Sequence, residues 1–275
     1  MKDQIWWITG ASSGLGEALA LALADEGAHL ILSGRNESAL EAVAAACAAK
    51  GVETFILPFE ATDYAALPDS TAQAWGWRGR VDGLINNAGI SQRSLAIETD
   101  FSVYERIIAV DLLAPIALTQ ANLPRMVAAG GGKIVAISSV AGIAGVALRS
   151  AYCAAKHGII GYHDSVRCEN EHLGVQVHVV APGSVATNVS RNALNANGAV
   201  RGASDAAIDA GMSPTEFATI TLAHIKAGKR EIIVATGMED HIAKLRRSDP
   251  DALFDQMAAM VTGGYAQKMA AERVD

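Results

Sequence analysis

Short apolar runs alternate with stretches of helical pattern along most of the chain. The runs predicted to be strands are residues 4–8, 28–33, 53–57, 83–86, 133–138, 176–181 and 231–235. The stretches predicted to be helices are 14–26, 37–50, 64–75, 101–128 and 151–172, with Pro115 bending the fourth. Parallel strands need crossover connections, usually helices, which cover both faces of the sheet. The alternation therefore predicts one doubly wound α/β domain over residues 1–275, with about seven parallel strands and no internal boundary.

Composition and charge exclude several classes of partner. Hydrophobic residues make up 51% of the 275 residues and charged residues 19%, which suffices for a large core. A net charge of -7 argues against broad binding to nucleic-acid phosphates. The most apolar later stretch, 134–148, is too short to span a bilayer, and no signal peptide is seen. We expect a soluble cytoplasmic protein without a membrane or nucleic-acid partner.

The cysteines show neither the spacing of a metal site nor a disulfide framework. They are three in number, an odd count, and lie far apart at Cys47, Cys153 and Cys168. A protein of a reducing compartment without a metal centre is the simplest interpretation.

A glycine-rich turn follows the first predicted strand, with the sequence TGASSGLG at residues 9–16. Glycines permit a tight turn and close approach of the backbone to a ligand, and the next helix points unsatisfied N–H groups at that ligand. A pyrophosphate fits such a turn, although glycine turns also occur without ligands. The residues predicted to bind it are Gly10, Ser12, Ser13, Gly14, Leu15 and Gly16.

The tip of the second strand predicts which dinucleotide binds. A carboxylate there would bind the ribose hydroxyls and repel a 2′-phosphate, but this chain has Ser33 followed by Arg35. A guanidinium suits a phosphate, so NADP(H) is preferred and NAD(H) remains possible. Alternatively, Arg35 is merely solvated. Glu60 and Ala61, after the third strand, are predicted at the adenine, where Glu60 either reaches the amino group or is solvated.

Tyr152 and Lys156 are four residues apart on a predicted helix, and Ser139 precedes the tyrosine by thirteen residues. Residues at i and i+4 share one helix face. A phenol that must ionise near neutral pH needs such a cation nearby. Taken alone the pair is weak evidence, since it also occurs as a packing or surface pair.

Several motifs together resemble those of the short-chain dehydrogenase/reductase family, in the family's order and spacing over roughly the first 190 residues. They are Thr9-Gly10-x-x-x-Gly14-x-Gly16, Asn86-Asn87-Ala88-Gly89, Ser139, Tyr152-x-x-x-Lys156 and Pro182-Gly183. Residues 149–152 and 187–193 further resemble NADP-linked reductases of lipophilic carbonyls, a branch that includes membrane-anchored animal members related to retinoid and steroid reductases. This chain lacks their N-terminal anchor, which predicts a soluble bacterial relative with a Rossmann-type fold.

The resemblance implies roles for the matched residues. Tyr152 would be the general acid in carbonyl reduction and the general base in alcohol oxidation. Lys156 would hold the nicotinamide ribose and favour the phenolate. Ser139, rather than the neighbouring Ser138, would hydrogen-bond the substrate oxygen. The residues implied to line the adenosine side are Asn87, Ala88 and Gly89, and those at the nicotinamide end are Pro182, Gly183, Val185 and Thr187.

One position departs from the family. Many members place an asparagine in the long helix to organise a proton-relay water, and Asp111 occupies that place here. Its carboxylate either organises the water and pairs with Lys156, or it is a structural helix residue. A charged Asp111 close to Lys156 would offset part of the effect of the lysine on Tyr152.

The substrate end is expected to involve a lid at 188–212 and a helical extension from about residue 238. The extension could cover the active site, form an interface or pack on the core. Residues 91–93 and 143–149 are expected in the same cleft. Much of this lining is apolar or small, which suits a lipophilic ketone or aldehyde, whereas Arg93, Arg149 or Arg191 would suit an anionic group.

The motifs predict an NADP(H)-dependent enzyme that interconverts a small-molecule carbonyl compound and an alcohol. Two alternatives remain: a non-catalytic NADP(H)-binding redox sensor, which would not need Tyr152, and an isomerase or dehydratase, which the short single domain disfavours. The resemblance also implies a homodimer or homotetramer, for which 101–128 and 151–172 offer surfaces.

Overall fold

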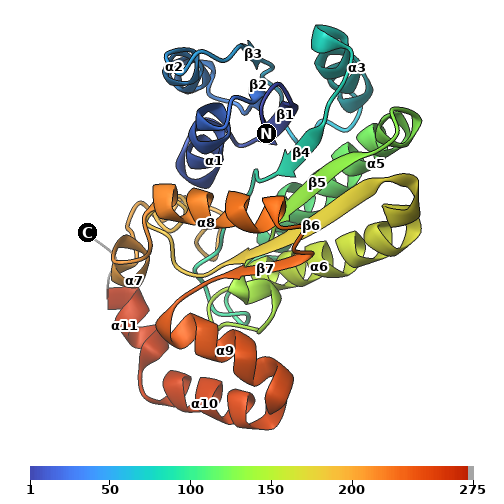
Figure 1. Ribbon diagram of the computed structural model, residues 1–275. Helices are drawn as coiled ribbons and strands as arrows, with labels where there is room; N and C mark the ends of the chain where they lie inside the picture. The colour runs from blue at the N-terminus through green and yellow to red at the C-terminus, as the bar shows by residue number, and fades with distance from the viewer. Residues whose placement is uncertain (272–275) are drawn as a thin grey trace.

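Seven parallel strands form one sheet in the computed structural model, which describes residues 1–271 (Figure 1). The strands are β1 Ile5–Thr9, β2 His29–Ser33, β3 Thr54–Ile56, β4 Gly83–Asn86, β5 Gly132–Ile137, β6 Val175–Pro182 and β7 Glu231–Val234. Their order across the sheet is β3-β2-β1-β4-β5-β6-β7, and every pairing is parallel. The predicted doubly wound α/β fold is confirmed.

The strand order reverses between β1 and β4, so the connections leave on opposite faces at that point. In open parallel sheets, ligands bind in the crevice at the carboxyl ends of the strands at such a reversal. β1 ends at Thr9, β4 at Asn86, β5 at Ile137 and β6 at Pro182. The segments that follow these four residues therefore meet at one edge of the sheet.

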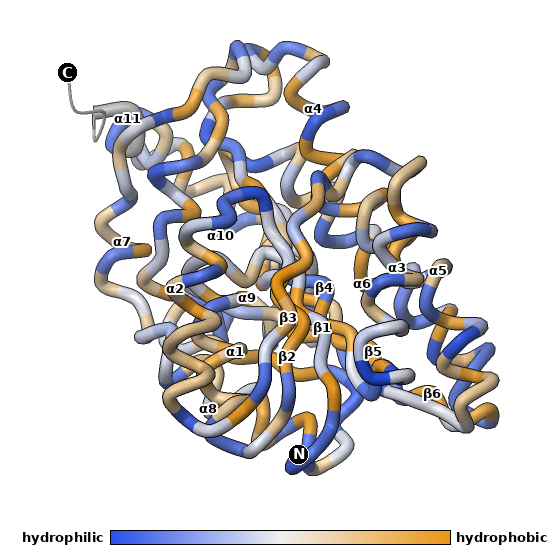
Figure 2. Tube along the Cα trace, turned by 90° about the horizontal axis from the view of Figure 1, so that it is seen from above, coloured by the Kyte–Doolittle hydropathy of each residue, from blue (hydrophilic) through white to orange (hydrophobic). Residues whose placement is uncertain are grey.

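Helices cover both faces of the sheet and bury both sides of each central strand. In β1, Trp6 and Ile8 pack with α1 (Gly14–Asp25), α2 (Glu37–Ala48) and α8 (Pro214–Lys226). Ile5 and Trp7 face the other core, which includes α3 (Leu67–Arg78), α5 (Ala114–Ala128) and α6 (Ser150–Asn170). Successive side chains of a strand alternate between faces, so a strand buried on both sides is continuously apolar. Apolar residues accordingly gather along β1 and β2 in Figure 2.

The stretch predicted as one helix over 101–128 is divided. It consists of α4 (Phe101–Ile108), a π-helical turn at Ala109–Leu113 and α5. Pro115 lies in the first turn of α5 and does not bend a continuous helix. Proline is tolerated there because the first N–H groups of a helix have no partner within it. The irregular turn carries Asp111.

Two further helices lie between β6 and β7, one within the predicted lid at 188–212 and one in the stretch after it, for which no element was predicted. They are the short α7 (Ala206–Asp209) and α8, which provides the crossover to β7. Ser213 caps α8 by accepting a hydrogen bond from the Glu216 amide, and Pro214 occupies its first turn. This is a common signature of a helix start.

Beyond β7, the chain continues in α9 (Gly237–Ser248), α10 (Pro250–Thr262) and α11 (Tyr265–Ala271), drawn in orange and red in Figure 1. Ile242 and Leu253 from this extension pack with Val140 and Ala144, which follow β5. The extension is thereby fixed beside the carboxyl edge of the sheet.

The glycine turn between β1 and α1 is closely packed. Gly10 has a left-handed φ of +64°, and a Cβ there would lie 2.9 Å from the Ala88 Cα atom. A Cβ on Gly16 would lie 2.2 Å from the Gly10 carbonyl oxygen and 2.6 Å from the Asn87 Nδ2 atom. Gly16 therefore lets α1 pack against the turn itself.

We expect Gly16→Ala to destabilise the protein, by about 1–3 kcal/mol if the turn yields as overpacked cores do. The clash is with backbone, which cannot rotate away. Thermal unfolding followed by circular dichroism would measure the loss. Gly76→Ala in α3 is the control, because a Cβ there meets nothing within 4 Å. An unchanged melting temperature for Gly16→Ala would contradict this packing argument.

Candidate active site

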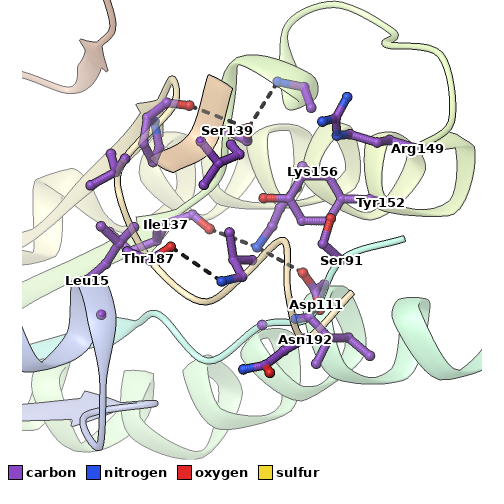
Figure 3. A pocket seen from close by; sticks show the side chains of 18 of the residues that line it. Leu15, Ser91, Asp111, Ile137, Ser139, Arg149, Tyr152, Lys156, Thr187 and Asn192 are labelled. Carbon is purple, nitrogen blue, oxygen red and sulfur yellow. Dashed lines mark hydrogen bonds and ion pairs between the residues drawn. The ribbon is translucent and has the colours of Figure 1, made fainter. Parts of the chain in front are cut away.

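A cavity of about 740 Å³ opens at the carboxyl edge of the sheet. Its walls come from the segments after β1, β4, β5 and β6, from α6 and from the C-terminal extension. Every predicted cofactor-binding residue lines it except Gly16, which lies behind the turn. The predicted catalytic residues Ser139, Tyr152, Lys156 and Asp111 line the same cavity (Figure 3).

The start of α1 is shaped to receive an anion. Ser13 precedes the helix in extended conformation, and its side chain makes no capping hydrogen bond. In α2, by contrast, Asn36 caps the helix by accepting from the Ala39 amide. The first N–H groups of α1 therefore remain for a ligand in the cavity, where the helix dipole also favours negative charge. Thr187 lies against the turn, since a Cβ on Gly14 would be 3.3 Å from its Cγ2 atom.

Lys156 is held at the centre of the site. Its Nζ atom donates a hydrogen bond to the Ile137 carbonyl oxygen at 3.1 Å and lies 3.1 Å from Asp111 Oδ2. The same nitrogen lies 5.5 Å from the centre of the Tyr152 ring. The predicted i, i+4 proximity of the tyrosine and the lysine on α6 is thus observed (Figure 3).

The two neighbouring serines are used differently. Ser138 is buried and donates a hydrogen bond to the Lys156 carbonyl oxygen at 2.9 Å, which ties β5 to α6. Ser139 is less buried, accepts from the Ala141 amide and donates to the Pro182 carbonyl oxygen at 3.4 Å. That last bond is long and can be exchanged for one to a substrate. The geometry favours Ser139 as the substrate contact.

Asp111 is fully buried in the π-helical turn. Its Oδ1 atom accepts a 2.8 Å hydrogen bond from the Ile90 amide, and Oδ2 pairs with Lys156. A Cβ on Gly89 would lie only 2.9 Å from Oδ2, so glycine is needed at that position. The carboxylate thereby joins the π turn, the segment after β4 and α6.

The pKa shifts of Asp111 and Lys156 indicate different protonation states for the carboxyl group. Burial raises the pKa of Asp111, with Lys156 and the Ile90 amide opposing the rise. Burial alone would lower the pKa of Lys156, but the charge of Asp111, the nearby Tyr152 and the hydrogen bond to Asp111 together raise that pKa. The raised pKa of Asp111 favours a neutral carboxyl group, whereas the raised pKa of Lys156 favours an ion pair. We favour the charged pair, because the 3.1 Å contact and the amide donor both stabilise the carboxylate.

The adenosine end offers one exposed cation. Arg35 has 68% of its side chain exposed and its Nη1 atom lies 3.6 Å from Glu60 Oε2. Such an exposed pair is weak and can open for a ligand. Ser33, in contrast, is buried and its Oγ atom accepts from the Trp7 indole nitrogen at 2.8 Å. A second hollow adjoins Arg35, and its lining residues are Ser12, Arg35, Asn36, Glu37 and Ser38.

The segment after β6, predicted to border the nicotinamide, is braced by a residue that the sequence did not indicate. Glu239, from the first turn of α9, accepts hydrogen bonds from the Ser184 amide at 2.5 Å and from its hydroxyl at 2.7 Å. Val185, which follows, is bridged to Met212. No motif in the sequence links residue 239 to the segment after β6.

The C-terminal extension also supplies lining that was not predicted. Its lining residues are Met238, Glu239, Ile242, Met257, Met260, Val261 and Tyr265. Of the three alternatives for this segment, these positions fit a cover over the active site. Of the three candidate arginines, Arg93 and Arg149 line the cavity, whereas Arg191 is exposed, bonds to the Gly202 carbonyl oxygen and does not.

Within residues 1–271, no group of three histidine, cysteine, aspartate or glutamate side chains could hold a metal ion. No helix in that part of the chain has the length and apolar character to cross a membrane.

Comparisons with known proteins agree on one family. Residues 4–198 match the family model described as short chain dehydrogenase. The chain is 38% identical over 265 residues to dehydrogenase/reductase SDR family member 7B of Bos taurus, covering 94% of this chain and 82% of that protein. It is also 38% identical over 199 residues to the human dehydrogenase/reductase SDR family member 7, covering 70% and 59%.

Solved structures agree with these relatives. A metagenomic short-chain oxidoreductase in complex with NADP is 29% identical, with a TM-score of 0.71 over 86% of this chain and 98% of that chain. A short-chain dehydrogenase from Streptomyces avermitilis is 26% identical, with a TM-score of 0.79 over 96% and 98%. A short-chain dehydrogenase/reductase from Burkholderia phymatum in complex with NAD shares the fold at 23% identity, with a TM-score of 0.80 over 91% and 95%.

Proposed function

Because this chain belongs to the short-chain dehydrogenase family, and is therefore an oxidoreductase, we propose that it interconverts a carbonyl compound and an alcohol with NADP(H). The observation that carries the proposal is the convergence of Ser139, Tyr152 and Lys156 in the cavity that begins at the glycine turn. The bound nicotinamide would supply or accept the hydride. The uncapped start of α1 fits its pyrophosphate.

The protein's part in the reaction is to position the carbonyl and move a proton. Tyr152 Oη donates a proton to the carbonyl oxygen in reduction and takes it back in alcohol oxidation. Ser139 Oγ releases its long bond to Pro182 and donates to the same oxygen, where negative charge develops. The buried ammonium group of Lys156 lies 5.5 Å from the centre of the Tyr152 ring and places a positive charge beside the residue that moves the proton.

NADP(H) preference follows from charge at the adenosine end. Arg35 is exposed and adjoins a hollow at the start of α2, where a 2′-phosphate would meet the guanidinium. Its partner Glu60 would swing aside, while the buried Ser33 leaves space for the ribose. Among the relatives, one solved neighbour holds NADP and another NAD. A cytoplasmic location and a homodimer or homotetramer stay predictions.

We expect Arg35→Ala to weaken NADPH binding by about tenfold and to leave NADH binding nearly unchanged, since a charge-assisted bond to phosphate contributes about 1.5–3 kcal/mol. Titration of nucleotide fluorescence would measure both dissociation constants. Arg230→Ala is the control, because Arg230 pairs with Glu171 just before β7, at the opposite edge of the sheet. Equal weakening of NADPH and NADH would mean that Arg35 does not contact the 2′-phosphate.

We expect Tyr152→Phe to lower kcat/KM for carbonyl reduction by about 10²–10⁴-fold, the usual contribution of a positioned general acid. NADPH oxidation across a panel of ketones and aldehydes is the measurement, with NADPH affinity as the control for folding. Near wild-type turnover in the variant would refute the proton-transfer role. Binding of NADPH without turnover of any carbonyl by the wild type would favour the redox-sensor alternative.

Asp111→Asn is expected to move the pH–rate profile of alcohol oxidation to lower pH. Removal of the carboxylate leaves more of the Lys156 charge to favour the ionised tyrosine. The profile of kcat from pH 6 to 10 tests this prediction. Asp164→Asn is the control, because Asp164 is an exposed carboxylate on α6, the helix that carries Lys156. An unchanged profile, or one moved to higher pH, would show that Asp111 does not offset Lys156.

A further inference from the structure

The buried Arg93 and the partly buried Arg149 share one carboxylate at the substrate end of the cavity. The Arg93 Nε atom lies 2.7 Å from Asp205 Oδ2, and the Arg149 Nη2 atom lies 3.2 Å from the same oxygen. The exposed fractions of the three side chains are 5%, 13% and 1%, respectively. Both arginines and Asp205 line the cavity that contains Tyr152.

The Asp205 carboxylate has a third arginine partner besides Arg93 and Arg149. Asp205 also pairs with Arg201 through its Oδ1 atom. Among residues 1–271, Arg93 and Arg149 have no second carboxylate within 4 Å. Their remaining hydrogen bonds go to neutral groups: Arg93 bonds to Ser91 and the Gln92 carbonyl, and Arg149 bonds to the Tyr265 hydroxyl. The single carboxylate of Asp205 therefore faces three guanidinium groups, and Arg93 and Arg149 form a local positive excess inside an acidic protein.

The ionisation of these groups agrees with this excess. Burial, together with the neighbouring charge of Arg149, lowers the pKa of Arg93 to about 10, so Arg93 stays charged at neutral pH. Burial alone would raise the pKa of Asp205, but the charge of Arg93 and the bonds from Arg201 and Arg93 lower it. Buried like charges destabilise a protein unless further anions compensate them. A ligand anion would supply that compensation.

The position of the pair suits a substrate group next to the reacting carbonyl. Arg149 lies three residues before Tyr152 at the start of α6, and Figure 3 shows both at the same side of the pocket. Around them the extension contributes apolar lining at Ile242, Met257 and Val261. A molecule with its carbonyl at Tyr152 can thus place an anion on the arginines and its apolar part against the extension.

We propose that Arg93 and Arg149 recognise an anionic group, a carboxylate or a phosphate, on the carbonyl substrate. The substrate class is then an amphipathic ketone or aldehyde with one anionic end, not a neutral lipophilic carbonyl. This inference rests on the proposed function for the carbonyl but stands on a different set of residues. Bidentate guanidinium contacts to either anion are the chemistry involved.

The Asp205→Asn variant distinguishes binding of a substrate anion by the arginines from a purely structural role. If the arginines only tied residue 205 and its loop to α6, Asp205→Asn would impair every substrate alike. If they bind a substrate anion, the same isosteric change removes a competing charge and favours charged substrates over neutral ones. Arg149→Gln should do the opposite.

The experiment compares kcat/KM for three aryl alkyl ketones that share one skeleton and bear a carboxylate, a phosphate or a neutral methyl ester. We expect the wild type to prefer a charged ketone over the ester by about tenfold or more. Asp205→Asn should raise this ratio and Arg149→Gln should lower it toward one. Arg191→Gln, outside the cavity, should leave the ratio unchanged. The two charged ketones distinguish carboxylate from phosphate recognition.

A second measurement does not depend on turnover. Saturated analogues, phenylbutanoate and phenylbutyl phosphate, are added to the NADP⁺-saturated protein, and the rise in melting temperature is recorded. We expect a larger rise for Asp205→Asn than for the wild type and none for Arg149→Gln. Binding that follows this pattern without turnover of any ketone would sink the proposed reaction alone. A preference for the neutral ester, or equal rises in all variants, would overturn the anion site.

Discussion

A parallel sheet that is buried on both faces can present polar chemistry only at the ends of its strands. The indole rings of Trp6 and Trp7 point to opposite cores, and each is fully buried. β1 can then contact a ligand only at its last residue, Thr9, and through the turn that follows. The same holds for β4, β5 and β6, so residues from four distant parts of the chain converge at one edge. The cavity and its polar lining follow from this constraint.

Lys156 is the point at which these segments are joined. Its ammonium group contacts the end of β5 through Ile137 and the π turn through Asp111, and Asp111 in turn holds the Ile90 amide after β4. A cation buried this deeply needs a partner, and Asp111 supplies a full opposite charge. Asp111 therefore affects the rigidity of the site as well as its charge.

Much of the fold could be predicted because short sequence patterns indicate its strands and its glycine turn. Apolar runs identified all seven strands, and the motif residues Gly10, Ser139, Tyr152 and Lys156 identified the cavity. What the sequence did not predict depends on contacts between distant residues. The π turn, which buries Asp111, lies in a stretch whose sequence pattern is helical throughout. The ion pairs of Asp205 with Arg93 and Arg149 join positions more than fifty residues apart. The start of α8 was visible as Ser213-Pro214 with Glu216, a signal that was overlooked.

The hydrogen bonds from Ser184 to Glu239 join the C-terminal extension to the segment proposed to border the nucleotide. Short-chain dehydrogenases differ in substrate, and exchanging C-terminal segments between them is an obvious route to new specificities. In this protein such an exchange would also remove the side chain that fixes the backbone before Val185. A chimaera would have to carry residues 184 and 239 together, because the two ends of the cavity are not separable modules.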